Sequence, residues 1–252
     1  MSDRKPYVAA NWKMQKTVEE TEEFLDRLIG DIGDLAGADI VICPPFTSLA
    51  AAVERCRRSP VRIAAQTMHE VESGAYTGEI SASMLTSLGV EAVVLGHSER
   101  RALFAETDEA LALKMVAALG AGLEPILCVG ETDAEREDGI TEDVLRRQLE
   151  ADLAQVEASQ LGSIVIAYEP VWAIGTGKTA SPEQAEEAIG FARSVVAGLD
   201  AAAAAQVRVL YGGSVKPDNA EELLRSEEID GALVGGASLD PADFMAICEA
   251  AP

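Results

Sequence analysis

One carboxylate, Glu169, stands two residues after the end of the apolar run Ser163 to Ala167, whose length and β-branched content predict a buried strand. The residues that follow, Pro170 to Lys178, are too apolar for a solvated linker and too long for an ordinary connection to the helix expected from Ser181. We interpret residues 170–178 as an active-site lid, because an apolar flap beside a lone carboxylate can exclude water and strengthen that carboxylate as a base. A strand-end glutamate is more often simply solvated, so the flap is what singles out Glu169.

The glycines of this flap do not complete a nucleotide site. Gly177-Lys178-Thr179 resembles the end of a P-loop, but a P-loop needs a glycine five residues before Gly177, where Trp172 stands. Gly175 to Ala180 fits a loose G-x-G-x-x-A pattern, but a dinucleotide fingerprint follows its strand directly and leads to an acidic residue ending the next strand. Neither condition is met, so we expect no nucleotide cofactor.

Further polar or glycine residues stand where other short apolar runs end. They are Asn11 and Lys13 after the first run, His97, Ser98 and Glu99 after the fourth, Gly212-Gly213-Ser214 after the seventh, and Gly235-Gly236 after the eighth. Bare backbone N–H groups at such glycines can hold a phosphate. Each residue alone has an ordinary explanation, as a core histidine, a solvated lysine or a tight turn. Together, a carboxylate base, an imidazole donor, a lysine and a phosphate cradle indicate proton transfer beside a carbonyl on a small phosphorylated molecule, with no metal or nucleotide required.

These residues need a scaffold that brings strand ends together. Strand patterns alternate with helix patterns eight times, and the strand runs are continuously apolar, as in a parallel sheet covered by helices. The expected strand and helix pairs are 7–12 with the helix after the capping box at 17–20, 39–43 with 47–56, 61–65 with 81–88, 90–95 with 107–119, 125–129 with 141–156, 163–167 with 181–196, 207–211 with 217–224, and 231–234 with 241–248. This pattern favours an α/β fold, a single-domain (β/α)8 barrel over residues 1–252, with active residues at the carboxyl ends of the strands. A doubly wound open sheet is the alternative, since alternation alone does not distinguish the two.

The composition narrows the setting and the partners. The chain is 48% hydrophobic and 25% charged, without an apolar run near the roughly 18 residues of a membrane span and without a signal-peptide core. We therefore expect a cytoplasmic protein with no membrane partner. Cys43, Cys56, Cys128 and Cys248 lack metal-ligand spacing and predict buried, reduced thiols. The net charge of −23 argues against nucleic acid, because a phosphate backbone would be repelled.

Four segments resemble the triosephosphate isomerase family: Asn11 to Met14, Gly96 to Arg101, Tyr168 to Lys178, and Tyr211 to Val215. The match runs in order from the first strand to the eighth, and the lid motif is the most specific part. The resemblance implies a (β/α)8 barrel that interconverts dihydroxyacetone phosphate and glyceraldehyde 3-phosphate and uses no cofactor.

The same resemblance implies roles for individual residues. It makes Glu169 the base and His97 the neutral electrophile. The implied substrate contacts are Asn11 and Lys13, the implied phosphate binders are Gly175, Ser214, Gly235 and Gly236, and the implied supporting residues are Ser98 and Glu99. A catalytically silent phosphate-binding scaffold is the alternative, but such a protein would be expected to have lost Glu169 or His97, and both are present.

Residues 66–79 form a stretch that is too long for an ordinary strand-to-helix loop. On a lone barrel this stretch would expose Tyr76 and Met68, whereas a second subunit could bury them near Met14. We therefore expect a dimerisation arm and a homodimer, with a floppy loop on a monomer as the alternative. The family resemblance adds that Thr77 reaches toward the neighbouring subunit's active site.

Overall fold

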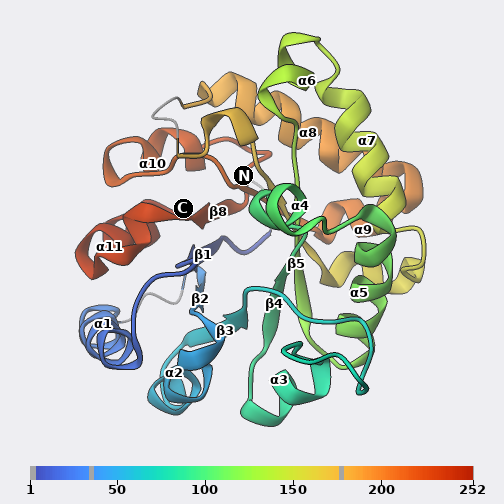
Figure 1. The fold of residues 1–252 in the computed structure, drawn as a ribbon. Coiled ribbons are helices and arrows are strands. Elements are labelled where there is room, and N and C mark those ends of the chain that lie inside the picture. The colour runs from blue at the N-terminus through green and yellow to red at the C-terminus, as the bar shows by residue number, and fades with distance from the viewer. Residues whose placement is uncertain (1–3, 34–36, 176–178, 252) are drawn as a thin grey trace.

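The apolar runs form a closed barrel of parallel strands in the order β1 to β8 (Figure 1), in a computed structural model that describes residues 4–33, 37–175 and 179–251. The strands are β1 (Tyr7–Asn11), β2 (Asp39–Cys43), β3 (Val61–Ala65), β4 (Ala92–Leu95), β5 (Glu124–Val129), β6 (Val165–Tyr168), β7 (Arg208–Tyr211) and β8 (Gly231–Val234). Because β1 pairs with both β2 and β8, the sheet has no free edge. The expected (β/α)8 barrel is confirmed and the open sheet is excluded.

The continuous apolar runs reflect burial of both faces of every strand. In β1, Tyr7 and Ala9 point into the barrel and Val8 and Ala10 pack against the helices. The interior is filled by side chains from alternate strand positions: Tyr7, Ala9, Val41, Cys43, Ala64, Ala92, Val94, Ile126, Cys128, Val165, Ala167, Leu210 and Leu233. The barrel is therefore a packed core, and only its rim is available for chemistry.

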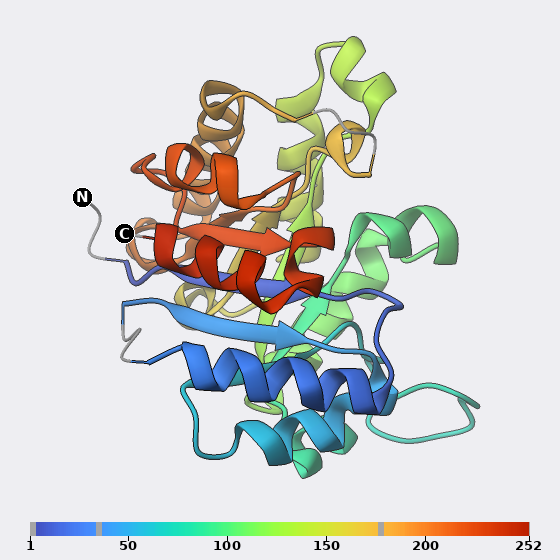
Figure 2. The same ribbon diagram turned by 90° about the vertical axis from the view of Figure 1, so that its left-hand side faces the viewer.

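The helices mostly surround the strands on the outside, whereas the helix that begins at Ser98 lies over the carboxyl ends of the strands (Figures 1 and 2). The helices are α1 (Val18–Asp31), α2 (Leu49–Cys56), α3 (Ala82–Leu88), α4 (Ser98–Phe104), α5 (Asp108–Gly120), α6 (Asp133–Glu137), α7 (Thr141–Asp152), α8 (Pro182–Leu199), α9 (Ala201–Gln206), α10 (Pro217–Leu224) and α11 (Pro241–Ala250). The capping box expected at Thr17 and Glu20 is present at the start of α1. No helix within the described residues is long and apolar enough to cross a membrane.

Three short α-helices were not expected as separate helices from the sequence, although the run at 201–205 favoured a helix end or turn. The α4 helix begins directly after His97, whose ring accepts a hydrogen bond from the Glu99 N–H and so caps it. The α6 helix begins at a capping box formed by Thr132 and Glu135. The α9 helix begins anew after α8 because the Asp200 side chain accepts a hydrogen bond from the Ala203 N–H.

Segment 66–79 extends past the rim at the carboxyl ends of the strands (Figure 2). Its base is closed by a hydrogen bond from the His69 N–H to the Ile80 carbonyl, 2.8 Å long, and the His69 and Tyr76 rings lie 4.3 Å apart. Tyr76 is 48% exposed, as expected. The expectation of an exposed Met68 is wrong, because this side chain packs into the main core directly after β3.

All four cysteines are buried and free. Cys43 and Cys128 lie inside the barrel, whereas Cys56 and Cys248 lie in the layer between strands and helices. Burial raises the pKa of the Cys43 thiol to about 12 and that of Cys56 to about 11. The thiols are consequently held in the protonated form at neutral pH.

Candidate active site

A cavity of about 700 Å³ opens at the carboxyl ends of the strands. Most of the residues singled out in the sequence line it: Asn11, Lys13, His97, Glu169, Gly175, Ser214, Gly235 and Gly236. They come from the ends of β1, β4, β6, β7 and β8, so the barrel brings together groups that are far apart in the chain. Ser98 and Glu99 lie beside this set and contact its members, whereas Thr77 is exposed on segment 66–79 and does not line the cavity.

Glu169 is buried at the end of β6, with 2% of its surface exposed. Its backbone N–H donates to the Val129 carbonyl, 2.7 Å away, which fixes the residue against β5. Its Oε2 accepts a hydrogen bond of 2.8 Å from the Ser98 N–H, and its Oε1 lies 2.9 Å from His97 Nε2. Both oxygens of the carboxylate are therefore engaged by the start of α4.

Gly130, which the sequence reasoning missed, allows this approach of β6 to β5. A Cβ added at Gly130 would lie 1.7 Å from the Glu169 carbonyl oxygen, so no larger residue fits without moving Glu169. The Gln148 side chain holds Gly130 by accepting from its N–H and donating to its carbonyl. A glycine at the end of a strand next to the strand that leads to Glu169 is the signal that could have found it.

The His97 ring is almost fully buried and its tautomer is fixed by the backbone. Nδ1 accepts a hydrogen bond of 3.2 Å from the Glu99 N–H, so the proton of the neutral ring is on Nε2, which faces Glu169. Burial lowers the pKa of His97, but the adjacent Glu169 outweighs burial, and the net pKa is raised above its ordinary value. The raised pKa therefore depends on Glu169 staying beside the ring.

Lys13 has a left-handed backbone, with φ of 52°, which is costly for a residue other than glycine. Three contacts hold it: its N–H donates to Asn11 Oδ1 at 3.1 Å, its carbonyl accepts from Gln66 Nε2 at 2.8 Å, and its Nζ lies 2.7 Å from Glu99 Oε1. This conformation places the ammonium group at the cavity. Gln66 is a second residue that the sequence reasoning did not assign to the site.

Glycines form the opposite wall of the cavity, at the ends of β7 and β8. A Cβ at Gly212 would lie 3.0 Å from Glu169 Cγ, and one at Gly213 would lie 2.2 Å from the Tyr211 hydroxyl oxygen. At Gly235 an added Cβ would reach 3.8 Å from Lys13 Cε. Bare backbone N–H groups and an ammonium group thus border the same space, which suits a small anion such as phosphate.

The expected lid lies only partly within the described residues, because 176–178 fall outside them. Its first part forms a tight turn at Val171–Ala173. The Trp172 Nε1–H and the Tyr168 hydroxyl both donate to Glu131 Oε1, at 2.9 and 3.1 Å. Glu131 is completely buried and also pairs with Arg136, and the sequence reasoning did not single it out.

The closed barrel and the cavity at its rim define the chain as a (β/α)8 barrel with its candidate site at the carboxyl ends of the strands. A family model described as "Triosephosphate isomerase" matches residues 6–251. The chain belongs to the triosephosphate isomerase family.

Curated relatives of the same description cover nearly the whole chain. The triosephosphate isomerase of Carboxydothermus hydrogenoformans is 51% identical over 247 residues, which is 98% of each chain. That of Symbiobacterium thermophilum is 51% identical over 249 residues, covering 98% of this chain and 97% of the relative. That of Solibacter usitatus is 52% identical over 247 residues, covering 97% of this chain and 98% of the relative.

Proposed function

We propose that this protein is a triose-phosphate isomerase that interconverts dihydroxyacetone phosphate and glyceraldehyde 3-phosphate. The observation that carries the proposal is the buried Glu169 carboxylate, 2.9 Å from His97 Nε2, at a cavity whose other wall consists of glycines and Lys13. Family membership supports the same activity.

The proposed mechanism is a proton transfer through an enediolate. Glu169 removes a proton from the carbon beside the substrate carbonyl, and the Nε2–H of His97 hydrogen-bonds the carbonyl oxygen as negative charge develops there. The Lys13 ammonium group stabilises that charge, and Asn11 contributes a further polar contact. Glu169 then returns a proton to the neighbouring carbon, so the carbonyl has moved by one position and no atom is gained or lost.

The present geometry implies that Glu169 moves during this cycle. Both of its carboxylate oxygens are engaged, one by the Ser98 N–H and one by His97. Rotation toward substrate would release these donors and leave His97 Nε2 available for the substrate oxygen. This rotation would also take Glu169, which raises the pKa of His97, away from the ring. The ring would then stay neutral while it acts as an electrophile.

The phosphate group of the substrate is proposed to bind at Gly175, Ser214, Gly235 and Gly236, with residues 170–178 closing over it as a lid. Closure would exclude water from the enediolate and strengthen each electrostatic contact in the site. The hydrogen bonds from Trp172 and Tyr168 to Glu131 support this, since they give the lid a fixed anchor at its first residues.

The test of the function is a coupled assay of purified protein with each triose phosphate in turn. Interconversion in both directions is expected without any added cofactor or metal. A folded protein that binds inorganic phosphate but interconverts neither substrate would instead favour the catalytically silent scaffold.

We also propose a cytoplasmic homodimer in which residues 66–79 act as the dimerisation arm. Several large apolar side chains at the rim are exposed in the single chain: Met14 is 93%, Leu103 74%, Phe104 66% and Tyr76 48% exposed. Segment 66–79 and α4 both project on the side to which the strands point (Figure 2). A two-fold partner could cover such a surface, and Thr77 would then reach the neighbouring active site.

The dimer proposal predicts that mass and activity fall together on dilution. Met14→Glu should shift this dissociation to higher protein concentration, because it puts a charge on the proposed interface. Leu199→Glu is the matched control: Leu199 is 46% exposed at the end of α8, on the opposite side of the barrel from the rim. Light scattering and activity measured over one dilution series decide the question, and a fully active species of 26.5 kDa would contradict the dimer.

A further inference from the structure

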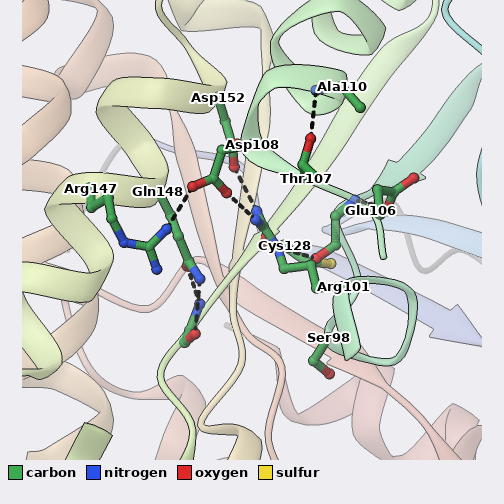
Figure 3. Close-up of polar contacts among 12 residues, drawn as sticks. Ser98, Arg101, Glu106, Thr107, Asp108, Ala110, Cys128, Arg147, Gln148 and Asp152 are labelled. Carbon is green, nitrogen blue, oxygen red and sulfur yellow. Dashed lines mark hydrogen bonds and ion pairs between the residues drawn. The ribbon is translucent and has the colours of Figure 1, made fainter. Parts of the chain in front are cut away.

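Arg101, in α4, ties together two strand ends beneath the active site (Figure 3). Its Nε donates to the Gly96 carbonyl at 2.8 Å and its Nη2 donates to the Cys128 carbonyl at 3.1 Å. Gly96 directly precedes His97, and Cys128 lies on β5, which pairs with the strand that ends before Glu169. One guanidinium group therefore fixes the segment that carries the proposed electrophile and the strand beside the one that leads to the proposed base.

Two carboxylates hold this guanidinium from its other side, and they differ in their surroundings (Figure 3). Asp108, at the start of α5, accepts from Arg101 Nη1 and shares its second oxygen with Arg147, which is 56% exposed. Asp152, the last residue of α7, accepts from Arg101 Nη2 at 2.6 Å and is completely buried. Asp108 thus links Arg101 to the exposed Arg147, whereas Asp152 binds Arg101 from the interior.

The Asp152 carboxylate is expensive to bury. Its Oδ1 has no hydrogen-bond donor among the described residues, so only one of its two oxygens is compensated by Arg101. An apolar residue at the end of α7 would avoid this cost. A role of the Asp152–Arg101 contact in the active site would explain why a carboxylate stands at this position.

We propose that Asp152 is a positioning residue for the isomerisation. By holding Arg101 in the orientation that serves the Gly96 and Cys128 carbonyls at once, it sets the distance between His97 and Glu169. Asp152 touches neither the substrate nor the reacting atoms, and this inference rests on the roles proposed above for His97 and Glu169.

The geometry predicts that turnover depends on Asp152 more than substrate affinity does. The residues proposed to hold the phosphate come from the ends of β6, β7 and β8, and within the described residues no hydrogen bond or ion pair joins them to Arg101, Asp108 or Asp152. A displaced Gly96–His97 segment would therefore lower kcat while KM stays nearly unchanged, because misplacement by ~1 Å can cost about 100-fold in rate.

The ionisation of Asp152 predicts a pH dependence of stability, which can be measured independently of the kinetics. The charged groups that face this side chain are Arg101 from α4 and Asp108 from α5, with Arg147 beyond Asp108. Burial and the nearby charge of Asp108 raise the pKa of Asp152 to about 7, although Arg101 acts in the opposite direction. A carboxyl group with a raised pKa in the folded state destabilises the fold as pH rises from its ordinary pKa of ~3.9, and the loss is complete above pH 7.

The experiment compares the kinetics of four variants with the parent protein. Asp152→Leu keeps the approximate size but leaves Arg101 without its interior partner, and we expect kcat to fall by at least about tenfold with KM within about twofold. Asp152→Asn still offers an oxygen to Arg101 Nη2 and should keep kcat within about threefold of the parent. Arg101→Lys should lose kcat, because an ammonium group cannot serve two carbonyls and two carboxylates in the planar geometry of a guanidinium. Glu150→Gln, an exposed site on the same helix, is the control for removing a carboxylate charge.

Two further measurements distinguish an effect on the position of His97 from a general loss of stability. Thermal unfolding should show that Asp152→Asn stabilises the protein at pH 8.5 and has no effect at pH 4. The His97 ring proton resonances should shift in Asp152→Leu and Arg101→Lys and stay in place in Glu150→Gln, whether or not the parent isomerises triose phosphates.

A folded Asp152→Leu or Arg101→Lys protein with the kcat and His97 resonances of the parent overturns the proposal. A rise in KM that matches the fall in kcat also overturns it, since that result indicates general disruption. Where Asp152→Leu does not fold, Arg101→Lys and Asp152→Asn decide. An inactive parent with shifted His97 resonances in the variants would refute the isomerase function and retain the positioning role.

Discussion

Glu169→Asp is expected to lower kcat by about 100-fold while KM changes little, because aspartate withdraws the carboxylate by one methylene and ~1 Å of misplacement has an effect of that size. The backbone cannot advance to compensate. The Glu169 N–H is bonded to the Val129 carbonyl at 2.7 Å, and Gly130 leaves no space beside the Glu169 carbonyl. Steady-state kinetics in both directions give the result.

Glu142→Asp, the same substitution at an exposed position in the first turn of α7, is the matched control and should leave kinetics unchanged. A thermal unfolding midpoint close to that of the parent would show that Glu169→Asp is folded. Turnover of Glu169→Asp within threefold of the parent would remove Glu169 from the role of base.

His97→Gln is expected to lower kcat by 100-fold or more, in the range seen when a preorganised donor to a developing oxyanion is removed. Glutamine can still accept the Glu99 N–H that now caps α4, so the helix start should survive. What is lost is an N–H fixed by a rigid ring and aimed at the substrate oxygen.

The chain supplies a close control for this substitution in its other histidine. His69 Nδ1 accepts from the Val71 N–H at 3.0 Å, as His97 Nδ1 accepts from the Glu99 N–H two residues on, but His69 lies at the base of segment 66–79. His69→Gln should therefore retain turnover at saturating protein concentration. Equal losses in both variants would mean that the effect is structural, and His97 would no longer be assigned as the electrophile.

The barrel was predictable because each strand is buried on both faces and several helices, among them α1, α3, α5 and α8, begin at a side-chain cap. Val61 to Ala65 and Gly231 to Val234 could be located to the residue from their apolar runs alone. The predicted ends of some elements were less accurate. The β6 strand begins at Val165 and not at Ser163, because a 3₁₀ turn occupies Ala158–Ser163. The helix expected to reach residue 156 ends at Asp152.

The site was predictable where one residue type at a strand end has a chemical meaning of its own. Glu169 and His97 belong to that group, and the family resemblance added their roles. Gly130, Gln66 and Glu131 do not, since each matters through a contact with a residue that is distant in the sequence. Met68 was wrongly expected at the surface, because a position in a long loop does not reveal which side chains turn back into the core.

The four buried thiols can serve as built-in probes of local opening of the structure. Their raised pKa values and lack of access make reaction with a thiol reagent slow until the surrounding structure opens. Cys56 and Cys248 become accessible when helices separate from the strands. Cys43 and Cys128 become accessible only when the barrel interior itself opens. The order in which the cysteines are labelled under native conditions is therefore a map of which layer of the barrel gives way first.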